Sequence, residues 1–393
     1  MNDRELVTQD ILNMPNTNLL IELPTGYGKT LIAIELLKKH LSKGNVLIVV
    51  PKNILKKNFM SEINKWWKNC PLNFTFTTYI SLHKYIGTWD TVIYDEAHHI
   101  SERCRELLKD IHSKYSIMLS ATISQKLKIE LSKHFNNLGF YKKSARDAIN
   151  KGILPDPKVY LIPLELDNTI NSEQIIQNAK YQKSITVDYK NRWNYIGKTT
   201  NTKLIIRCTK RQFMIDFDSK IEYWKKRYMI SKNEIIKNKW LKLCGDRLKI
   251  LSNWRTDYSI KLLKYLDKYR TLTFCNSIEQ TQILGKYCIN SKNKSYQTIL
   301  SLFNSGKINH ITACSMLDEG ANLSNCQIGI YAILNSSERL IKQKLGRLLR
   351  HEHPIIIIPY FIRTREEELV KTMIQDYNPE LISIINDIKD IQL

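Results

Sequence analysis

The stretch "NLLIELPTGYGKT" (residues 18–30), followed by "LIAIELLKKHL" (31–41), decides how this chain folds. An apolar run, a turn with two glycines and an amphipathic run predict a β-strand, a tight loop and an α-helix. In that arrangement the N–H groups of the loop and the N-terminus of the helix converge, and a phosphate group fits where they meet. The stretch therefore indicates a phosphate-binding loop.

Individual residues of the loop fit this interpretation, with one exception. Gly26 and Gly28 let the backbone approach the phosphates, Lys29 reaches the terminal phosphates, and the Thr30 hydroxyl holds Mg²⁺. Leu23 stands where the pattern G-x-x-x-x-G-K-[ST] has its first glycine. Taken alone, the stretch leaves an ordinary turn between a strand and a helix open.

Apolar β-like runs alternate with helical patterns on both sides of a different middle segment. The first series runs from residue 18 to about 120 and comprises "NLLIEL", "VLIVV", "FTFT", "TVIY" and "SIMLS". The second begins near 271 and comprises "TLTFC", "HITAC", "IGIYAIL" and "PIIIIPYFI". Short apolar strands separated by crossover helices predict parallel sheets covered on both faces. A chain of 393 residues is also too long for one compact core, so we expect two α/β halves.

The composition points to a polyanionic partner. Lys and Arg number 60 against 38 Asp and Glu, which gives a net charge of +22 and suits nucleic acid or an anionic membrane surface. No apolar run approaches the ~18 residues that span a bilayer, and the polar start lacks the layout of a secretory signal. The eight cysteines are scattered without a C-x-x-C pair, which favours neither a zinc site nor a disulfide framework. We expect a cytoplasmic protein with no membrane partner.

Most of the charge lies in the middle of the chain. Between Lys180 and Arg270 there are 24 Lys or Arg against 8 Asp or Glu, with aromatic residues interleaved. Residues 203–217 could form a hairpin, followed by the helical pattern "SKIEYWKKRYM". The alternative is a solvated basic face whose aromatics form a helix core. For the segment as a whole, the concentrated charge favours binding to a phosphate backbone, with Lys225, Lys226 and Arg227 as candidate contacts.

A second candidate site follows in "TVIYDEAHHI". A β-like run that ends in Asp95 places this carboxylate at the carboxyl edge of a parallel sheet, where open α/β folds bind ligands. Beside a phosphate-binding loop, Asp95 is expected to anchor Mg²⁺ and Glu96 to act as general base on the attacking water. The alternative is an acidic strand end that caps the next helix.

The third candidate is "SSERLIKQKLGRLLR". A serine cap predicts a helix on which Gln343, Arg347 and Arg350 share one face. Across a cleft from Lys29, arginines of this kind stabilise charge that develops during phosphoryl transfer, and such fingers contribute about 10³–10⁵ in rate. Without a nucleotide site elsewhere, the same face would be a solvated basic stripe.

Together these blocks resemble the superfamily 2 helicases and translocases, in particular phage and repair DNA helicases. "LPTGYGKT" resembles motif I, whose first glycine is commonly replaced in the family, and "VVPKNIL" resembles motif Ia. "DEAH" resembles motif II, "SAT" motif III, "TFCNS" motif IV, "LDEGANL" motif V and "QKLGRLLR" motif VI. The blocks stand in the family's order and cover most of both halves.

The resemblance implies further roles. Thr25 and Tyr27 join the glycines in the nucleotide-binding loop, and Arg347 and Arg350 jointly form the finger. Relatives often carry an adenine-contacting Gln upstream, where this chain has Gln9; its flanks differ, so an exposed helix residue is an equal alternative. The other implied residues are coupling residues His98, Ser120 and Thr122, and Gln343 as a contact to the nucleotide or to the adjoining motif. Glu319, Gly320 and Asn322 of motif V are implied to face nucleotide or nucleic acid, with Gly320 favoured for nucleotide and Asn322 for the strand. Pro51, Lys52 and Ser277 are implied strand contacts.

The resemblance also implies fold and activity. We expect two RecA-like lobes at 1–150 and 246–393, with the crossing between lobes and a basic, partly helical insertion at 151–245. The expected function is an ATP- and Mg²⁺-dependent helicase, acting on DNA in preference to RNA. Alternatives are a duplex translocase or annealing motor that does not separate strands, an RNA-remodelling ATPase, and a non-catalytic nucleic-acid-binding protein. The compact size and the composition fit a phage-like protein in a bacterial or infected-host cytoplasm.

Overall fold

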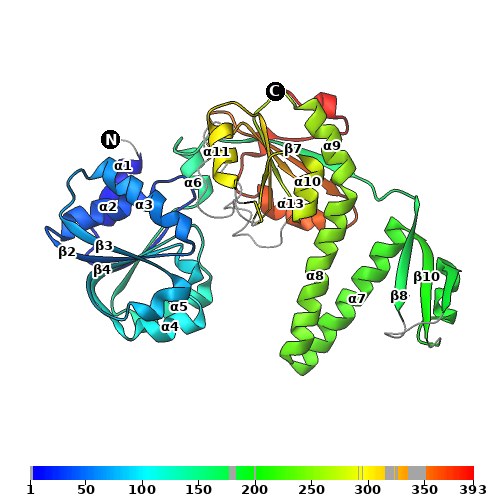
Figure 1. Ribbon diagram of the computed structural model, residues 1–393, viewed down its shortest axis with the longest axis horizontal. Helices are drawn as coiled ribbons and strands as arrows, with labels where there is room; N and C mark the ends of the chain where they lie inside the picture. The colour runs from blue at the N-terminus through cyan, green and yellow to red at the C-terminus, as the bar shows by residue number, and fades with distance from the viewer. Residues whose placement is uncertain are drawn as a thin grey trace.

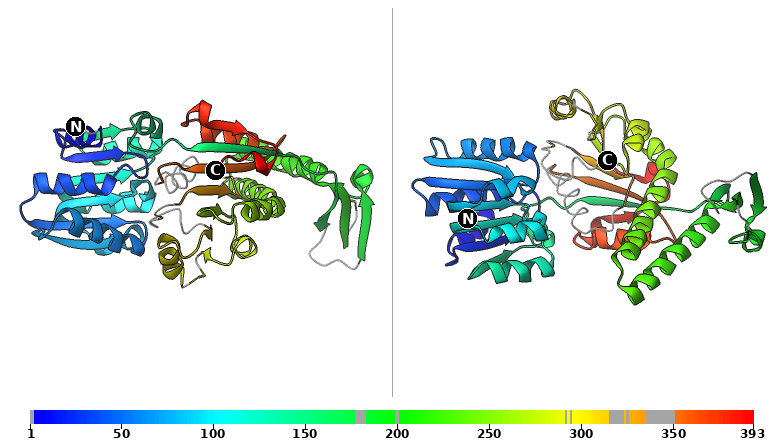
Figure 2. Two further views of the ribbon diagram at one scale, coloured as in Figure 1. Left: turned by 90° about the horizontal axis from the view of Figure 1, so that it is seen from above. Right: turned by 60° about the horizontal axis from the view of Figure 1, so that its bottom comes forward.

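The chain forms two α/β lobes and an elongated insertion (Figure 1). The computed structural model describes residues 3–176, 183–198, 201–290, 292–293, 295–314, 323, 326–334 and 351–393. The views in Figure 2 show the insertion on the side of the second lobe that faces away from the first. The expected fold class is confirmed.

The first lobe is a six-stranded, all-parallel sheet in the order β3-β2-β4-β5-β1-β6, with helices on both faces (Figure 1). Its central strands are almost wholly apolar because helices cover both sides. Since all six run in one direction, the loops after β1, β2, β4 and β5 meet at the same edge. The elements are α1 (Asp3–Leu12), β1 (Asn18–Glu22), α2 (Lys29–His40), β2 (Gly44–Val50), α3 (Asn53–Trp66), β3 (Leu72–Thr78), β4 (Gly87–Asp95), α4 (Glu102–Leu108), β5 (Ile111–Ser120), α5 (Gln125–His134), β6 (Leu138–Lys142) and α6 (Ala145–Asn150).

The second lobe is also an all-parallel sheet, of seven strands in the order β12-β13-β11-β14-β15-β7-β16. Its described elements are β7 (Lys158–Leu164), α9 (Thr256–Tyr265), β11 (Thr271–Phe274), α10 (Ile278–Leu284), β12 (Cys288–Ile289), α11 (Tyr296–Asn304), β13 (His310–Ala313), β14 (Ile328–Tyr331), β15 (Ile355–Phe361), α13 (Glu366–Ile374) and β16 (Ile382–Ile384).

The chain enters the second lobe earlier than the sequence boundaries suggested. Strand β7 lies between β15 and β16, although residues 151–245 were expected to be crossing and insertion. Pairing over the whole length of β7 with β15 draws it into this sheet, and that partner lies far along the chain. The expected boundary at 245 also falls inside one continuous helix, α8 (Glu234–Trp254).

The insertion consists of a small sheet and a pair of antiparallel helices. Strands β8 (Ile170–Ile176), β9 (Lys183–Asp188) and β10 (Thr202–Thr209) form a sheet in the order β8-β10-β9. Helix α7 (Lys210–Ser231) leads away from β10, and α8 returns to the second lobe (Figure 1). The expected hairpin over 203–217 is wrong, because the helix begins inside it. Thr209 caps the backbone N–H of Gln212, whose side chain bonds back to Thr209.

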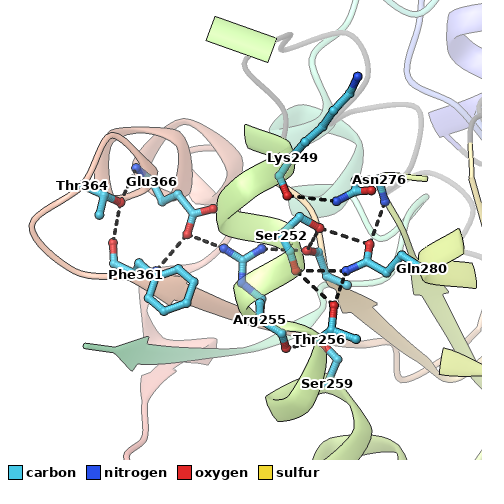
Figure 3. A network of polar contacts seen from close by, with 11 residues as sticks. Lys249, Ser252, Arg255, Thr256, Ser259, Asn276, Gln280, Phe361, Thr364 and Glu366 are labelled. Atoms are coloured by element: carbon cyan, nitrogen blue, oxygen red, sulfur yellow. Dashed lines mark hydrogen bonds and ion pairs between the residues drawn. The ribbon is translucent and has the colours of Figure 1, made fainter. Parts of the chain in front are cut away.

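A buried polar network fixes the base of α8 to the second lobe (Figure 3). Arg255 donates a 2.8 Å hydrogen bond to the carbonyl of Ala332 and pairs with Glu366, and both charged side chains are at most 1% exposed. Ser252 donates to the same carbonyl at 2.6 Å, and its own carbonyl accepts from Gln280 at 3.0 Å. The insertion is thereby joined to the residue after β14, to α10 and to α13 by buried bonds.

None of the helices in the described ranges is long and apolar enough to cross a membrane.

Several predicted residues lie outside the described part of the chain. The predicted residues that fall outside these ranges are Glu319, Gly320, Asn322, Gln343, Arg347 and Arg350.

Candidate nucleotide-binding site

The loop between β1 and α2 has the geometry that a phosphate-binding turn requires. Gly26 and Gly28 have φ values of +90° and +103°, a region that side-chain-bearing residues rarely adopt. A Cβ at Gly26 would also lie 3.3 Å from the Leu154 side chain. Leu23, in place of the first glycine, is fully buried in the core. The Lys29 ammonium folds over the loop and donates to the Leu23 carbonyl at 3.1 Å.

The carboxylates of the DEAH stretch lie at the carboxyl end of β4. Asp95 Oδ1 accepts a 3.1 Å hydrogen bond from the Glu96 N–H, which fixes the turn. Glu96 has φ +50°, and a non-glycine residue in this region costs about 1–3 kcal/mol, a strain that is concentrated at functional sites. The buried Tyr79 hydroxyl donates to the Asp95 carbonyl at 2.8 Å. Burial, followed by the charge of Asp95, raises the pKa of Tyr79 well above its usual value, so this donor stays protonated.

A chain of contacts links the DEAH stretch to the SAT stretch. His98 Nδ1 lies 3.3 Å from Glu96 Oε2 and 3.0 Å from Ser120 Oγ. Ser120 Oγ in turn donates to the Thr122 carbonyl at 2.9 Å. The Ser120 carbonyl accepts from the Leu23 N–H at 3.0 Å. The structure thus brings the three predicted coupling residues together and joins them to both acidic and phosphate-binding segments.

Residues of the phosphate-binding loop and the two DEAH carboxylates line one open cavity of about 1040 Å³, whereas His98, Ser120 and Thr122 lie outside its lining. Its wall includes both lobes, because His351 and Glu352 face it together with residues of the first lobe. The Thr25 hydroxyl is buried and has no hydrogen-bond partner among the described residues, which fits an anion held by the loop. The predicted residues that line the cavity are Thr25, Gly26, Gly28, Lys29, Thr30, Asp95 and Glu96. A nucleoside triphosphate with Mg²⁺ fits this donor set and size.

The N-terminal helix contributes a different residue from the one expected. Gln9 is exposed on α1 and does not line the cavity, whereas Arg4 does and donates to the Gly26 carbonyl at 3.5 Å. Tyr27 was expected among the nucleotide contacts, but its side chain is 1% exposed and reaches Asp3 at 3.4 Å. Burial and Asp3 raise the pKa of Tyr27 to about 12. Asp3 also pairs with Lys151 at 2.7 Å, so α1 contacts both the loop, through Tyr27, and the end of α6.

Helix α3 supplies further lining residues that the sequence analysis missed. Asn58, Glu62 and Trp66 face the cavity, and the Trp66 indole N–H donates to Glu62 at 2.8 Å. The periodicity of α3 marks it as an amphipathic helix but does not show which part of its polar face borders a ligand. The exposure of Trp66, 44% in the structure, could not be foreseen from the sequence.

The expected strand-binding residues lie on separate parts of the molecule. Pro51 and Lys52 follow β2, with Lys52 exposed at the start of α3. Ser277 caps α10, and its hydroxyl accepts from the Gln280 N–H at 3.1 Å. Residues 225–227 lie on α7, where Lys225 pairs with Glu222 at 3.2 Å. The strand-binding roles of these residues stay predictions.

Comparisons with known proteins agree with this geometry. The family model for the res subunit of type III restriction enzymes matches residues 5–125. The chain is 24% identical to the DNA 3'-5' translocase XPB2 of Sulfurisphaera tokodaii over 356 residues, which cover 84% of this chain and 74% of the relative.

Two solved structures share the fold at low sequence identity. Dbp5 of S. cerevisiae, bound to RNA and ADP BeF3, has a TM-score of 0.54 and 10% identity, covering 98% of this chain and 89% of Dbp5. A fragment assigned to an HsdR subunit of a type I restriction enzyme from Vibrio vulnificus has a TM-score of 0.56 and 15% identity, covering 98% and 68%.

Proposed function

We propose that this superfamily 2 helicase-type protein is a DNA motor that uses ATP and Mg²⁺ to move along its track and to separate strands. The chain is a nucleic-acid-dependent ATPase of the superfamily 2 helicase and translocase group, as the res-subunit match and the XPB2 relative indicate. The observation that carries the proposal is the cavity that holds the phosphate-binding loop and the DEAH carboxylates together.

The residues of the cavity divide the chemistry between them. Lys29 and the loop N–H groups hold the β- and γ-phosphates, while Thr30 and Asp95 hold Mg²⁺. A Mg²⁺ ion held by these two residues would supply positive charge against the phosphates. Glu96 orients the attacking water and accepts its proton, since it borders the same cavity as Lys29.

The contact chain from Glu96 to Thr122 supports a coupling role. His98 is close to both Glu96 and Ser120, so a change at the water-activating carboxylate alters the hydrogen bonds of the SAT stretch. We assign His98, Ser120 and Thr122 to the transmission of hydrolysis into lobe movement.

The finger role of Arg347 and Arg350 also remains a proposal, with Gln343 beside them as a nucleotide contact. His351, directly after Arg350, borders the cavity from the second lobe. Closing of the lobes around ATP would bring this segment toward Lys29, and reopening after hydrolysis would change the grip on the bound strand.

DNA is proposed as the track over RNA. Support comes from the XPB2 relative, which is a DNA translocase, and from the motif VI segment "QKLGRLLR", which differs from the H-R-x-G-R of DEAD-box RNA helicases. The basic insertion, with Lys225, Lys226 and Arg227, is proposed to bind the phosphate backbone. Pro51, Lys52, Ser277 and Asn322 are proposed to contact the bound strand, two from each lobe.

Steady-state ATP hydrolysis tests the proposal. Single-stranded DNA, duplex DNA, forked DNA and RNA are supplied in parallel, with Lys29→Ala as the blank. Stimulation by DNA and not by RNA is expected. Stimulation by RNA alone would mean that the protein acts on RNA and not on DNA. Hydrolysis that no nucleic acid stimulates would refute a nucleic-acid motor.

A further inference from the structure

The turn between α7 and α8 lies at the end of this helical hairpin and is held by capping hydrogen bonds. Figure 1 shows it projecting from the molecule, away from the sheets of both lobes. Lys232 ends α7 with φ +52°, and its N–H donates to the Tyr228 carbonyl at 2.8 Å. The Asn233 side chain accepts from the N–H groups of Ile235 and Ile236 at 2.8 and 3.4 Å. Both helix ends are therefore capped, which fixes the direction of the side chains beside the turn.

Aromatic rings and cations hold the two helices together near the turn. Tyr228 of α7 stacks on Trp240 of α8 with ring centroids 5.8 Å apart. The Lys239 ammonium lies 3.8 Å from the centroid of Trp224 on the other helix. The aliphatic and aromatic core of the insertion lies farther back, around Phe217 and Leu251. The hairpin is thus stiff toward its tip without burying the apolar side chains at the turn.

Three large apolar side chains remain exposed at this tip. Ile230 and Ile235 are 87% and 79% exposed, and Met229 is 50% exposed. Single exposed apolar residues are ordinary, but here three occur within residues 229–235 of one projecting, capped turn. We define Met229, Ile230 and Ile235 as the apolar tip.

Positive charge surrounds the apolar tip. Residues 225–242 contain seven Lys or Arg and one Glu. This charge repels a second copy of the same hairpin and attracts a polyanion. Proteins that combine cations with apolar wedges use the cations on phosphates and the wedge between base steps, which unstacks them.

We propose that the apolar tip packs against the outermost base pair at a junction of single-stranded and duplex DNA, while the flanking cations hold the phosphates. This rests on the proposed function, since it takes DNA as the track, and it names the part of the chain that opens the duplex. A protein that bound DNA only through the phosphate backbone would need the cations but not the apolar tip.

The test uses the double variant Ile230→Ser/Ile235→Ser in the full chain. Ile and Ser have similar helix propensities, and both positions are exposed, so the fold is expected to survive, with an unchanged Tm as the check. Ile215→Ser is the matched control, since Ile215 is 54% exposed on α7 but distant from the turn. Each protein is bound, without ATP, to a fork with 2-aminopurine at the junction pair.

The wild type and Ile215→Ser are expected to raise 2-aminopurine fluorescence as the junction base unstacks. The tip variant is expected to lose most of this rise, while its fork affinity, read by anisotropy, changes by less than about threefold because the cations remain. An equal rise in the tip variant, or no rise in the wild type, would overturn the proposal.

Failure of the tip proposal can be separated from failure of the proposed function. If DNA stimulates ATP hydrolysis but fluorescence does not rise, the proposed DNA motor stands and the proposal that the apolar tip contacts the junction fails. If the substitutions instead convert a dimer into a monomer on size exclusion and leave fluorescence intact, the tip is an interface between copies, which also overturns the proposal. Fluorescence that depends on the tip in a protein whose ATP hydrolysis ignores DNA would refute the motor alone.

Discussion

Removing the charge of Glu366 should destabilise the second lobe more than removing the whole buried pair. Glu366 neutralises Arg255 where neither side chain is more than 1% exposed. In Glu366→Gln the guanidinium remains buried without a counter-charge, and breaking such a pair costs about 3–5 kcal/mol. In Arg255→Met/Glu366→Gln no charge is left.

The structure indicates what the double variant loses. The Phe361 N–H keeps an acceptor, since it bonds to the Glu366 side chain at 2.8 Å and Gln retains a carbonyl oxygen. The Ala332 carbonyl keeps its bond from Ser252. The double variant then loses only the hydrogen bonds that the Arg255 guanidinium makes to Ala332 and Glu366, which lowers the free energy of unfolding by about 1–2 kcal/mol in all. The double variant should therefore be more stable than Glu366→Gln.

Native-state hydrogen exchange measures this difference lobe by lobe. Peptides from β15 report the free energy of opening of the second lobe, and peptides from β1 serve as an internal reference that should not change. Glu234→Gln is the matched control, because Glu234 pairs with Lys237 at the surface and its neutralisation should cost less than about 1 kcal/mol. Additive losses in the double variant, or a loss below about 1 kcal/mol in Glu366→Gln, would mean that Glu366 does not stabilise the buried charge of Arg255.

Three further predictions concern catalysis, nucleic-acid binding and pH. Glu96→Gln should keep nucleotide binding, measured by fluorescent nucleotide titration, and lower DNA-stimulated hydrolysis by about 10²–10⁴, because the water loses its base; intact hydrolysis would remove Glu96 from this role. Changing Lys225, Lys226 and Arg227 to Gln should flatten the slope of log K against log salt on single-stranded DNA by up to about 2; an unchanged slope would make them merely solvated. Burial lowers the pKa of His310 from 6.5 to about 4. As the pH falls, the imidazole is therefore protonated in the unfolded chain before it is protonated in the folded protein. The free energy of unfolding should fall by about 3 kcal/mol between about pH 6.5 and pH 4. His310→Gln should remove that share of the pH dependence in urea unfolding, and identical pH profiles for both proteins would contradict it.

The sequence predicted those parts of the fold that local pattern controls. Buried strands such as β2 are near-continuous apolar runs, and α2 begins where glycines end, so the position of the loop with Lys29 followed directly. Asp95 was predictable for the same reason, since a strand that ends in a carboxylate places it at the sheet edge. The cavity brings these two predicted segments together.

Long-range pairing and local capping explain the errors. Strand β7 belongs to the second sheet because of a partner almost 200 residues later, which no local pattern reveals. The start of α7 did have a signal, since Thr209 and Gln212 form a capping box, but the preceding β-branched run favoured a hairpin. Arg4 had none, because its place beside Gly26 depends on how α1 packs behind the loop.

Displacement of a roadblock tests most directly whether ATP hydrolysis at the cavity moves the protein along DNA. Streptavidin on biotinylated single strands and a third strand on duplex DNA are challenged with the protein and ATP, with Lys29→Ala and Glu96→Gln alongside. We expect ATP-dependent displacement by the wild type on at least one track and none by either variant. DNA-stimulated hydrolysis without displacement on either track would show that the protein does not move along DNA.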